Sequence, residues 1–381
     1  MKWEERPLGE VLCVDLDQVP TDPSETYQLA GVYGFGRGLF VRGPLSGANT
    51  TYKGFNRLHA GQFVISVPKA WEGAIAEVTE DFDGLFLSPV FPTFTPDSDA
   101  LLCRYLAWFF RRPASWEQMR SKSKGIGARR ESLSSEQFLS INIPLPPVKE
   151  QRKIVAKLDA AAERIARIEA AQADNAEDFD RLLESLLFDN PSAAPTPMRE
   201  LVIPRAPDTK VLGDQIYDFA GVYSFGRGVF SSITKTGLDF AYTALTQVRA
   251  GEFTYPKLMA WEGAFGIIPP ECDGCFVSPE FPVFGVRQDL VFPELLDAYF
   301  RSPRVWPEIA AISSGTNARR RRLQPSSFLN YRFPLPSREA QKQIRDTLEA
   351  RTRLRAAQDS RAADLAALMP SLLDRAFKGE L

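Results

Sequence analysis

The chain has 381 residues, which is enough for two domains and their connecting segments. Its 44% hydrophobic and 25% charged residues are typical of a soluble globular protein, and a formal net charge of −2 excludes a strong positive field over the whole chain. Four cysteines, no apolar signal segment and no run of about 18 apolar residues argue against a disulfide framework and a membrane span, so we expect a cytoplasmic protein.

An internal repeat is the strongest feature of the sequence. Residues 27–40 read YQLAGVYGFGRGLF, and residues 217–230 read YDFAGVYSFGRGVF, a shift of 190 residues. The motif Ala-Trp-Glu-Gly-Ala at 70–74 returns at 260–264 with the same shift. About a third of the positions from Tyr27 to Leu158 are identical to their copies, which predicts two domains of one fold.

Each half of the chain begins with patterns that are typical of short strands and turns. Residues 61–67 and 74–78 are apolar or alternating, and glycines, prolines and Asp-Gly pairs border them. Residues 101–110 and 293–300 then have the composition of short helices. The fold class that we expect is therefore α+β, with two similar β-rich domains.

A long helix is expected after each globular half. Pro-Leu-Pro at 144–146 and at 334–336 ends the preceding segment, and apolar residues then recur three and four apart on one stripe. About 40 residues would form a rod of roughly 60 Å, and the simplest partner for each rod is the other one, running antiparallel. Such a coiled-coil spacer would give a pseudo-two-fold symmetric molecule. The expected boundaries are 1–146 for the first domain, 147–188 for the central helix, 189–336 for the second domain and 337–381 for the last helix.

The order of these parts carries a family resemblance. The alternation of domain and rod, the motif at 143–151, the opening Trp3 with Leu8–Glu10, and the closing residues 372–381 resemble a type I restriction–modification DNA specificity subunit. The resemblance covers essentially the whole chain. It departs at Ser337–Ala340, where the second copy of the helix start differs from the first.

The resemblance implies a subunit that does no chemistry. It would carry two target recognition domains, each reading half of a split site in double-stranded DNA, and its helices would hold two adenine methyltransferase subunits. Those partners would use S-adenosylmethionine, and restriction or translocase subunits would use Mg and ATP. The alternatives are the same DNA reader in another phage-defence methyltransferase complex, a structural adaptor that binds no DNA, and an enzyme with an unrecognised carboxylate site.

A basic, glycine-containing turn occurs in both halves, at 122–130 and at 313–322. Arginine and lysine neutralise phosphates, and glycine lets the backbone approach them, although a solvated charged loop has the same composition. The glycine-rich turns at 34–38 and 224–228 precede no helix pattern, so we interpret them as tight turns that present an arginine rather than as nucleotide-binding loops. The candidate DNA-binding residues are Arg37, Lys53, Arg57, Lys122, Lys124, Arg129, Arg130, Arg227, Lys235, Asn317, Arg319 and Arg320.

Base specificity is expected where the two copies differ. Residues 41–59 and 231–249 share little and are rich in polar side chains of the kind that read base edges, although a drifting surface loop would look the same. Those side chains include Asn49, Thr50, Thr51, Lys53, Asn56 and Arg57 in the first copy and Thr234, Lys235, Thr236, Asp239, Thr243, Thr246 and Gln247 in the second. Trp71 and Trp261 are expected in the core.

Partner subunits are expected on the apolar stripe of the long helices. The candidate contact residues are Ile154, Leu158, Ile165, Ile344, Leu348 and Leu354. No metal site is expected, because the CxxC pair Cys272 and Cys275 has no counterpart in the other copy. We also expect no catalytic residue, since the chain has one histidine and no methyltransferase, nucleotide-binding or nuclease motif.

Overall fold

The computed structural model describes residues 3–123, 132–315 and 321–381. Contacts divide the chain into two compact units. The first unit comprises residues 1–171 and 359–381, and the second comprises residues 172–358. Two helices of 41 residues each, α4 (Val148–Phe188) and α9 (Arg338–Lys378), contribute one part to each unit.

The first unit is built from three sheets. Their strand orders are β3-β6-β9-β4-β5, β2-β10-β7-β8 and β1-β11. The strands are β1 Glu5–Pro7, β2 Leu12–Val14, β3 Asp17–Pro20, β4 Thr26–Val32, β5 Leu39–Ser46, β6 Gly54–Arg57, β7 Phe63–Ile65, β8 Ile75–Glu77, β9 Phe86–Leu87, β10 Thr93–Pro96 and β11 Asn142–Pro144. The short helices are α1 Cys103–Phe109, α2 Pro113–Lys122 and α3 Ser135–Leu139.

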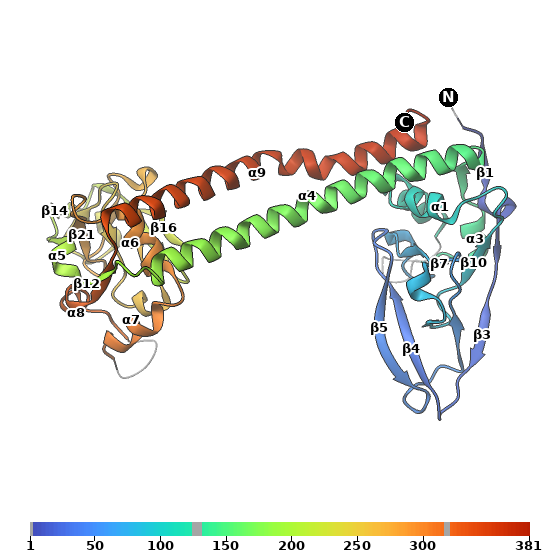
Figure 1. Ribbon diagram of the computed structural model, residues 1–381, viewed down its shortest axis with the longest axis horizontal. Coiled ribbons are helices and arrows are strands. Elements are labelled where there is room, and N and C mark those ends of the chain that lie inside the picture. Colours follow the sequence, from blue (N-terminus) through green and yellow to red (C-terminus); the bar gives the residue numbers. More distant parts are fainter. Residues whose placement is uncertain (1–2, 124–131, 316–320) are drawn as a thin grey trace. The chain divides into compact units, whose positions relative to one another are not determined.

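The five-stranded sheet carries a long antiparallel hairpin, β4–β5, whose register shifts between Leu29 and Ala30. On its other side β4 pairs in parallel with β9, through Leu29 and Phe86. Within this unit β3, β4 and β5 extend away from α4, whereas β7 and β10 lie near α1 (Figure 1). The β4–β5 hairpin therefore has one end near the helices of this unit and the other end away from them.

Aromatic side chains fill the core of the first unit. Phe63, Phe94 and Phe138 are fully buried, and the rings of Phe63 and Phe138 are stacked with centroids 6.1 Å apart. The start of α4 adds Leu158 to this core, and the end of α9 adds Phe377. The two helices therefore run antiparallel where they pack in this unit.

A buried glutamine fixes the start of α4. The side chain of Gln151 is fully buried, and its Nε2 donates hydrogen bonds to the carbonyls of Ala100 (2.7 Å) and Pro146 (2.8 Å). Its Oε1 accepts from the backbone N–H of Leu102 at 2.9 Å. Since Leu102 directly precedes α1, one side chain connects the long helix to the globular part.

The second unit repeats this topology. Its sheets have the orders β14-β17-β20-β15-β16, β13-β21-β18-β19 and β12-β22. The strands are β12 Ala194–Pro197, β13 Val202–Arg205, β14 Thr209–Lys210, β15 Ile216–Tyr223, β16 Gly228–Thr236, β17 Ala244–Gln247, β18 Phe253–Thr254, β19 Gly266–Ile267, β20 Phe276–Val277, β21 Val283–Val286 and β22 Arg332–Leu335. The short helices are α5 Met198–Leu201, α6 Pro293–Arg301, α7 Trp306–Ile312 and α8 Pro325–Asn330.

The long helices also enter the core of the second unit. Leu183 and Leu187 near the end of α4 and Ile344 near the start of α9 pack into one buried cluster. Arg351 and Asp180 form an ion pair of 2.5 Å between the two helices. Gln341 repeats the role of Gln151, because its Nε2 donates to the carbonyls of Leu290 and Pro336 and its Oε1 accepts from a backbone N–H.

The structure confirms the expected α+β class with two similar β-rich parts and two long helices. It corrects part of the assignment of partner-contact residues. Ile154, Leu158 and Ile344 are 6%, 1% and 0% exposed because they fill the cores of this chain's own units. Leu348 packs against the second core, while Ile165 and Leu354 are half-buried. None of the described helices has the length and apolar character needed to cross a bilayer.

Candidate nucleic-acid interface

The turn between the two strands of the long hairpin presents an exposed phenylalanine in each unit. Phe35 follows β4 and Phe225 follows β15, and their side chains are 59% and 63% exposed. Both have a positive φ, 61° and 62°, which bulky L-residues rarely adopt. Within the described residues no other non-glycine has a positive φ. The same unusual conformation therefore recurs at equivalent positions of the two copies.

Backbone hydrogen bonds hold this turn on the neighbouring Ala-Trp-Glu-Gly segment. The N–H of Phe35 donates to the carbonyl of Glu72 at 2.8 Å, and the N–H of Gly36 donates to that of Gly73 at 2.8 Å. In the second unit Phe225 and Gly226 donate in the same way to Glu262 and Gly263, at 2.8 and 3.1 Å. The repeated motif at 70–74 and 260–264 thus serves as the support of the turn.

An arginine from the helical layer completes the support. Arg111 Nε donates to the carbonyl of Gly36 at 3.1 Å, and Arg301 Nε donates to that of Gly226 at 2.6 Å. Burial lowers the pKa of the Arg111 guanidinium, and the nearby Arg104 acts in the same direction. A Cβ at Gly36 would lie 2.9 Å from Arg111 Cγ, so this position requires glycine for space as well as for its positive φ.

Arg37 and Arg227 occupy equivalent, exposed positions in the two turns. Arg37 Nε donates to the carbonyl of Gly34 at 3.2 Å, and its guanidinium lies 4.7 Å from the centroid of the exposed Tyr33 ring. Arg227 Nε donates to the carbonyl of Ser224 at 3.3 Å and lies 4.5 Å from the ring centroid of Tyr223. Each guanidinium is therefore oriented by a carbonyl and an aromatic face.

The tryptophans of the repeated motif are half-buried at the surface, so the expectation that they belong to the core was wrong. Trp71 lies under the Arg120 guanidinium at 5.3 Å, and Lys69 Nζ lies 5.1 Å from the same ring. Trp261 lies under Arg321 at 5.7 Å. Arg120 and Arg321 are not equivalent in the repeat, yet each places a guanidinium over the equivalent tryptophan. Cation–π pairing thus takes the place of core packing here.

The basic turn that follows lies largely outside the described residues. Lys122 is exposed at the last position of α2, and its carbonyl accepts a hydrogen bond from Gln137 Nε2 at 2.8 Å. Lys124, Arg129, Arg130, Asn317, Arg319 and Arg320 fall in the segments that the structure does not describe. Their assignment as DNA contacts stays a prediction.

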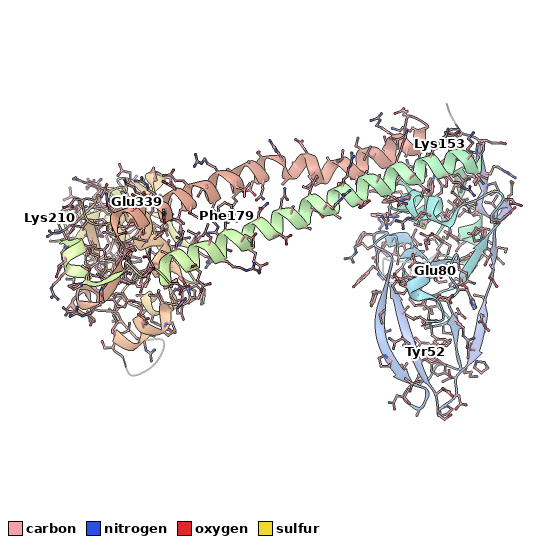
Figure 2. The ribbon with its side chains drawn as sticks, viewed as in Figure 1. Tyr52, Glu80, Lys153, Phe179, Lys210 and Glu339 are labelled. Atoms are coloured by element: carbon pink, nitrogen blue, oxygen red, sulfur yellow. The ribbon has the colours of Figure 1, made fainter. Side chains whose placement is uncertain are left out.

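The divergent segments form the second strand of the hairpin, a short turn and the next strand of the same sheet in both units. Lys53 is exposed in the connection before β6, next to Tyr52, which Figure 2 shows at the end of the first unit away from α4. Arg57 lies 4.0 Å from Asp17 and 5.5 Å from the ring of Phe86. Lys235 is half-buried on β16 opposite Tyr217.

Several polar side chains of these segments serve the fold, which corrects their assignment as base readers. Asn56 is 1% exposed and donates to the carbonyl of Phe91 at 3.0 Å. Thr246 is 4% exposed. Asp239 accepts hydrogen bonds from the N–H and the hydroxyl of Thr236 and so caps a short turn. The exposed polar residues of the two segments remain candidates for reading bases.

Sequence reasoning missed Phe35, Phe225 and the cations over the tryptophans. The signal for the phenylalanines was present, because they sit in a stretch, Phe-Gly-Arg-Gly, that is identical in the two copies. Arg120 and Arg321 left no such signal, since they are not at equivalent positions. The positive φ of Phe35 and Phe225 was not predictable from the sequence, because it depends on hydrogen bonds to carbonyls about 37 residues further along the chain.

The cysteine pair lies in the hydrophobic interior of the second unit. Cys272 and Cys275 belong to a buried cluster of the second unit, and burial raises the pKa of both thiols. Among the described residues no group of three or more histidine, cysteine or acidic side chains could hold a metal ion.

The surface around the hairpin turns combines exposed rings with arginines, an arrangement suited to binding a polyanion that carries aromatic bases.

Comparison with known proteins gives a consistent result. A family model described as the type I restriction modification DNA specificity domain matches residues 1–177. The HsdS subunit from Thermoanaerobacter tengcongensis superimposes with a TM-score of 0.65 at 20% identity, covering 100% of this chain and 97% of that one. A chain from a structure titled for complex assembly and conformational transition of the type I R-M system gives 0.63 at 18% identity, covering 100% and 98%. These likenesses concern the fold, and no curated protein matches the chain.

Proposed function

We propose that the chain is a member of the type I restriction modification DNA specificity family, whose domain model matches residues 1–177, and that it selects the DNA sequence for a methyltransferase complex. The observation that carries the proposal is the duplication. Two units with the same strand orders each present an arginine and an exposed ring on the same hairpin turn. Each unit would read one half of a bipartite target.

The two long helices would act as the spacer between the two readers. In the first unit the start of α4 packs with the end of α9, and in the second unit the end of α4 packs with the start of α9. Helices of 41 residues are about 60 Å long, and a DNA duplex presents equivalent faces about every 34 Å. A stiff pair of this length suits two half-sites separated by a fixed number of base pairs. Because the units are so alike, related and partly palindromic half-sites are expected.

Two adenine methyltransferase subunits would dock on the helices. Three apolar side chains, Ile168 and Leu182 of α4 and Leu368 of α9, are 44%, 47% and 44% exposed. These side chains are apolar surface that the helices would offer to a partner. S-adenosylmethionine would be bound by these partners, and Mg and ATP by restriction or translocase subunits where they are present. This chain would supply recognition and assembly.

The exposed residues of the divergent segments would choose the bases. Replacement of residues 231–249 by a copy of residues 41–59 tests this within one chain, because both segments have the same strands and turns. The replacement is expected to change one half of the methylated motif in a host that carries the system, so that both halves become alike. An unaltered motif would show that the segments are not the readers.

Binding by the reconstituted complex tests the proposal as a whole. The full chain, purified with its two methyltransferase subunits, is expected to bind one DNA sequence over competitor DNA, with an affinity that falls steeply as salt rises. Selective binding that survives high competitor concentrations separates a DNA reader from a structural adaptor. A complex that assembles but shows no sequence preference contradicts the proposal.

A further inference from the structure

We propose that Phe35 and Phe225 are rigid apolar fingers that pack against a base step of duplex DNA, while Arg37 and Arg227 bind the adjacent phosphates. The inference rests on the proposed function and adds a mode of contact to it. No base has to be read by these residues. Their part is to hold and deform the duplex at the same place in each half-site.

The first support is the backbone conformation. A left-handed conformation is unfavourable for a bulky L-residue, so it persists only where neighbours impose it. Here the carbonyls of Glu72 and Glu262 accept the N–H of each phenylalanine at 2.8 Å. The adjoining glycines at 36 and 226 are fixed by the arginines of the helical layer. The finger is thus held by groups outside its own turn.

The second support is the solvent exposure of the Phe35 and Phe225 rings, although each has an aromatic neighbour against which it packs. Phe35 meets Trp116 at a centroid distance of 5.6 Å, and Phe225 meets Trp306 at 6.2 Å. Each ring nevertheless remains about three-fifths exposed, at 59% and 63%. An apolar ring that is held in a strained conformation and faces solvent in both copies favours a ligand that covers it.

The charges around the ring indicate which ligand. In the first unit Arg37 adjoins the finger, Arg120 lies over Trp71 of the supporting segment, and Lys122 ends the same helix as Arg120. The acid of this segment, Glu72, is paired with Lys69 at 3.1 Å. In the second unit Arg227 and Arg321 occupy the corresponding surroundings. Cations that flank an apolar ring match phosphates that flank stacked bases.

The two turns have the same sequence, and this indicates what the phenylalanines contribute. Residues 35–38 and 225–228 have the same sequence, Phe-Gly-Arg-Gly, whereas the segments that follow diverge. Identical fingers cannot tell two half-sites apart, so they contribute affinity and distortion to both. Apolar wedges of this kind act by partly unstacking a base step.

Phe35→Asn and Phe225→Asn test the proposal in the full chain assembled with its methyltransferase subunits. Asparagine adopts the left-handed conformation more readily than phenylalanine, so the thermal midpoint is expected to stay unchanged. Affinity for a duplex that carries the methylated motif is expected to fall about tenfold for each variant. The wild type is expected to raise the fluorescence of 2-aminopurine at the contacted step, and the asparagine variants should lose this rise. Phe35→Tyr should restore both, and Val90→Ala, at an exposed apolar position of the same unit, should change neither.

Each outcome decides the matter. Unchanged affinity and unchanged fluorescence in both asparagine variants would overturn the finger while leaving the proposed function intact. Loss of methyltransferase subunits from the complex, with DNA binding retained by what remains, would also overturn it, because the surface would then be a protein contact. A wild-type complex that selects no DNA sequence would overturn the proposed function and the finger together.

Discussion

Asn56 and Lys53 lie three residues apart in the same divergent segment but have opposite surroundings. Asn56 is buried and hydrogen-bonded to Phe91, whereas Lys53 is exposed. Asn56→Ala should lower the free energy of unfolding by about 1–3 kcal/mol and leave the methylated motif unaltered. Lys53→Ala should change the unfolding free energy by less than about 0.5 kcal/mol and weaken DNA binding with a shallower salt dependence. Denaturation and salt titration of both variants check this, and a changed motif in Asn56→Ala would contradict it.

Asp15 gives the first unit a dependence on pH. Hydrogen bonds from Thr95 and Gln62 hold the pKa of this carboxyl below its ordinary value. Because the folded state favours the ionised form, the stabilisation is present above the ordinary pKa of about 4 and is lost as the pH falls through the lower folded pKa. Asp15→Asn should therefore reduce the loss of thermal stability between neutral pH and about pH 3. The exposed Asp99→Asn is the matched control, and an equal effect of both would refute the assignment.

The long helices depend on the glutamines at their starts. Gln151 makes three hydrogen bonds with no exposed surface, and replacement by leucine leaves the N–H of Leu102 and two carbonyls without a partner. Gln151→Leu and Gln341→Leu should each cost about 2–4 kcal/mol of unfolding free energy. Lys149→Gln, at an exposed position of the same turn, should cost almost nothing. Hydrogen exchange of the first turns of α4 and α9 locates the effect, and protection that is unchanged would contradict it.

The long helices were predictable from the pattern of the sequence. The helix expected over 147–188 begins at Val148 and ends at Phe188, because a proline pair precedes it and its apolar stripe is continuous. The burial of that stripe was harder to predict. The spacing of Ile154 and Leu158 gives a face but not its partner, and the partner turned out to be the domain that precedes the helix. Likewise asparagine is a residue type that reads base edges, but the surroundings of Asn56 are those of a core residue.

At the scale of the whole molecule, the repeat predicted two copies of one fold, and the strand orders confirm it. Because the copies align at a shift of 190 residues without a gap, each position of one copy can be compared with its equivalent in the other. Where the copies agree, at the hairpin turn and its support, the structure shows the same hydrogen bonds. Where they disagree, the strands persist and only the side chains change. A shared framework with variable side chains suits two readers of related but not identical half-sites.

The central claim is that two such readers are held by one pair of helices on a single DNA target. Sequencing the methylated bases of a host that expresses this chain with its methyltransferase subunits tests it most directly. We expect methylated adenines in a motif of two specific halves separated by a fixed number of unspecified base pairs. A single uninterrupted motif, or methylation with no motif at all, would contradict the account.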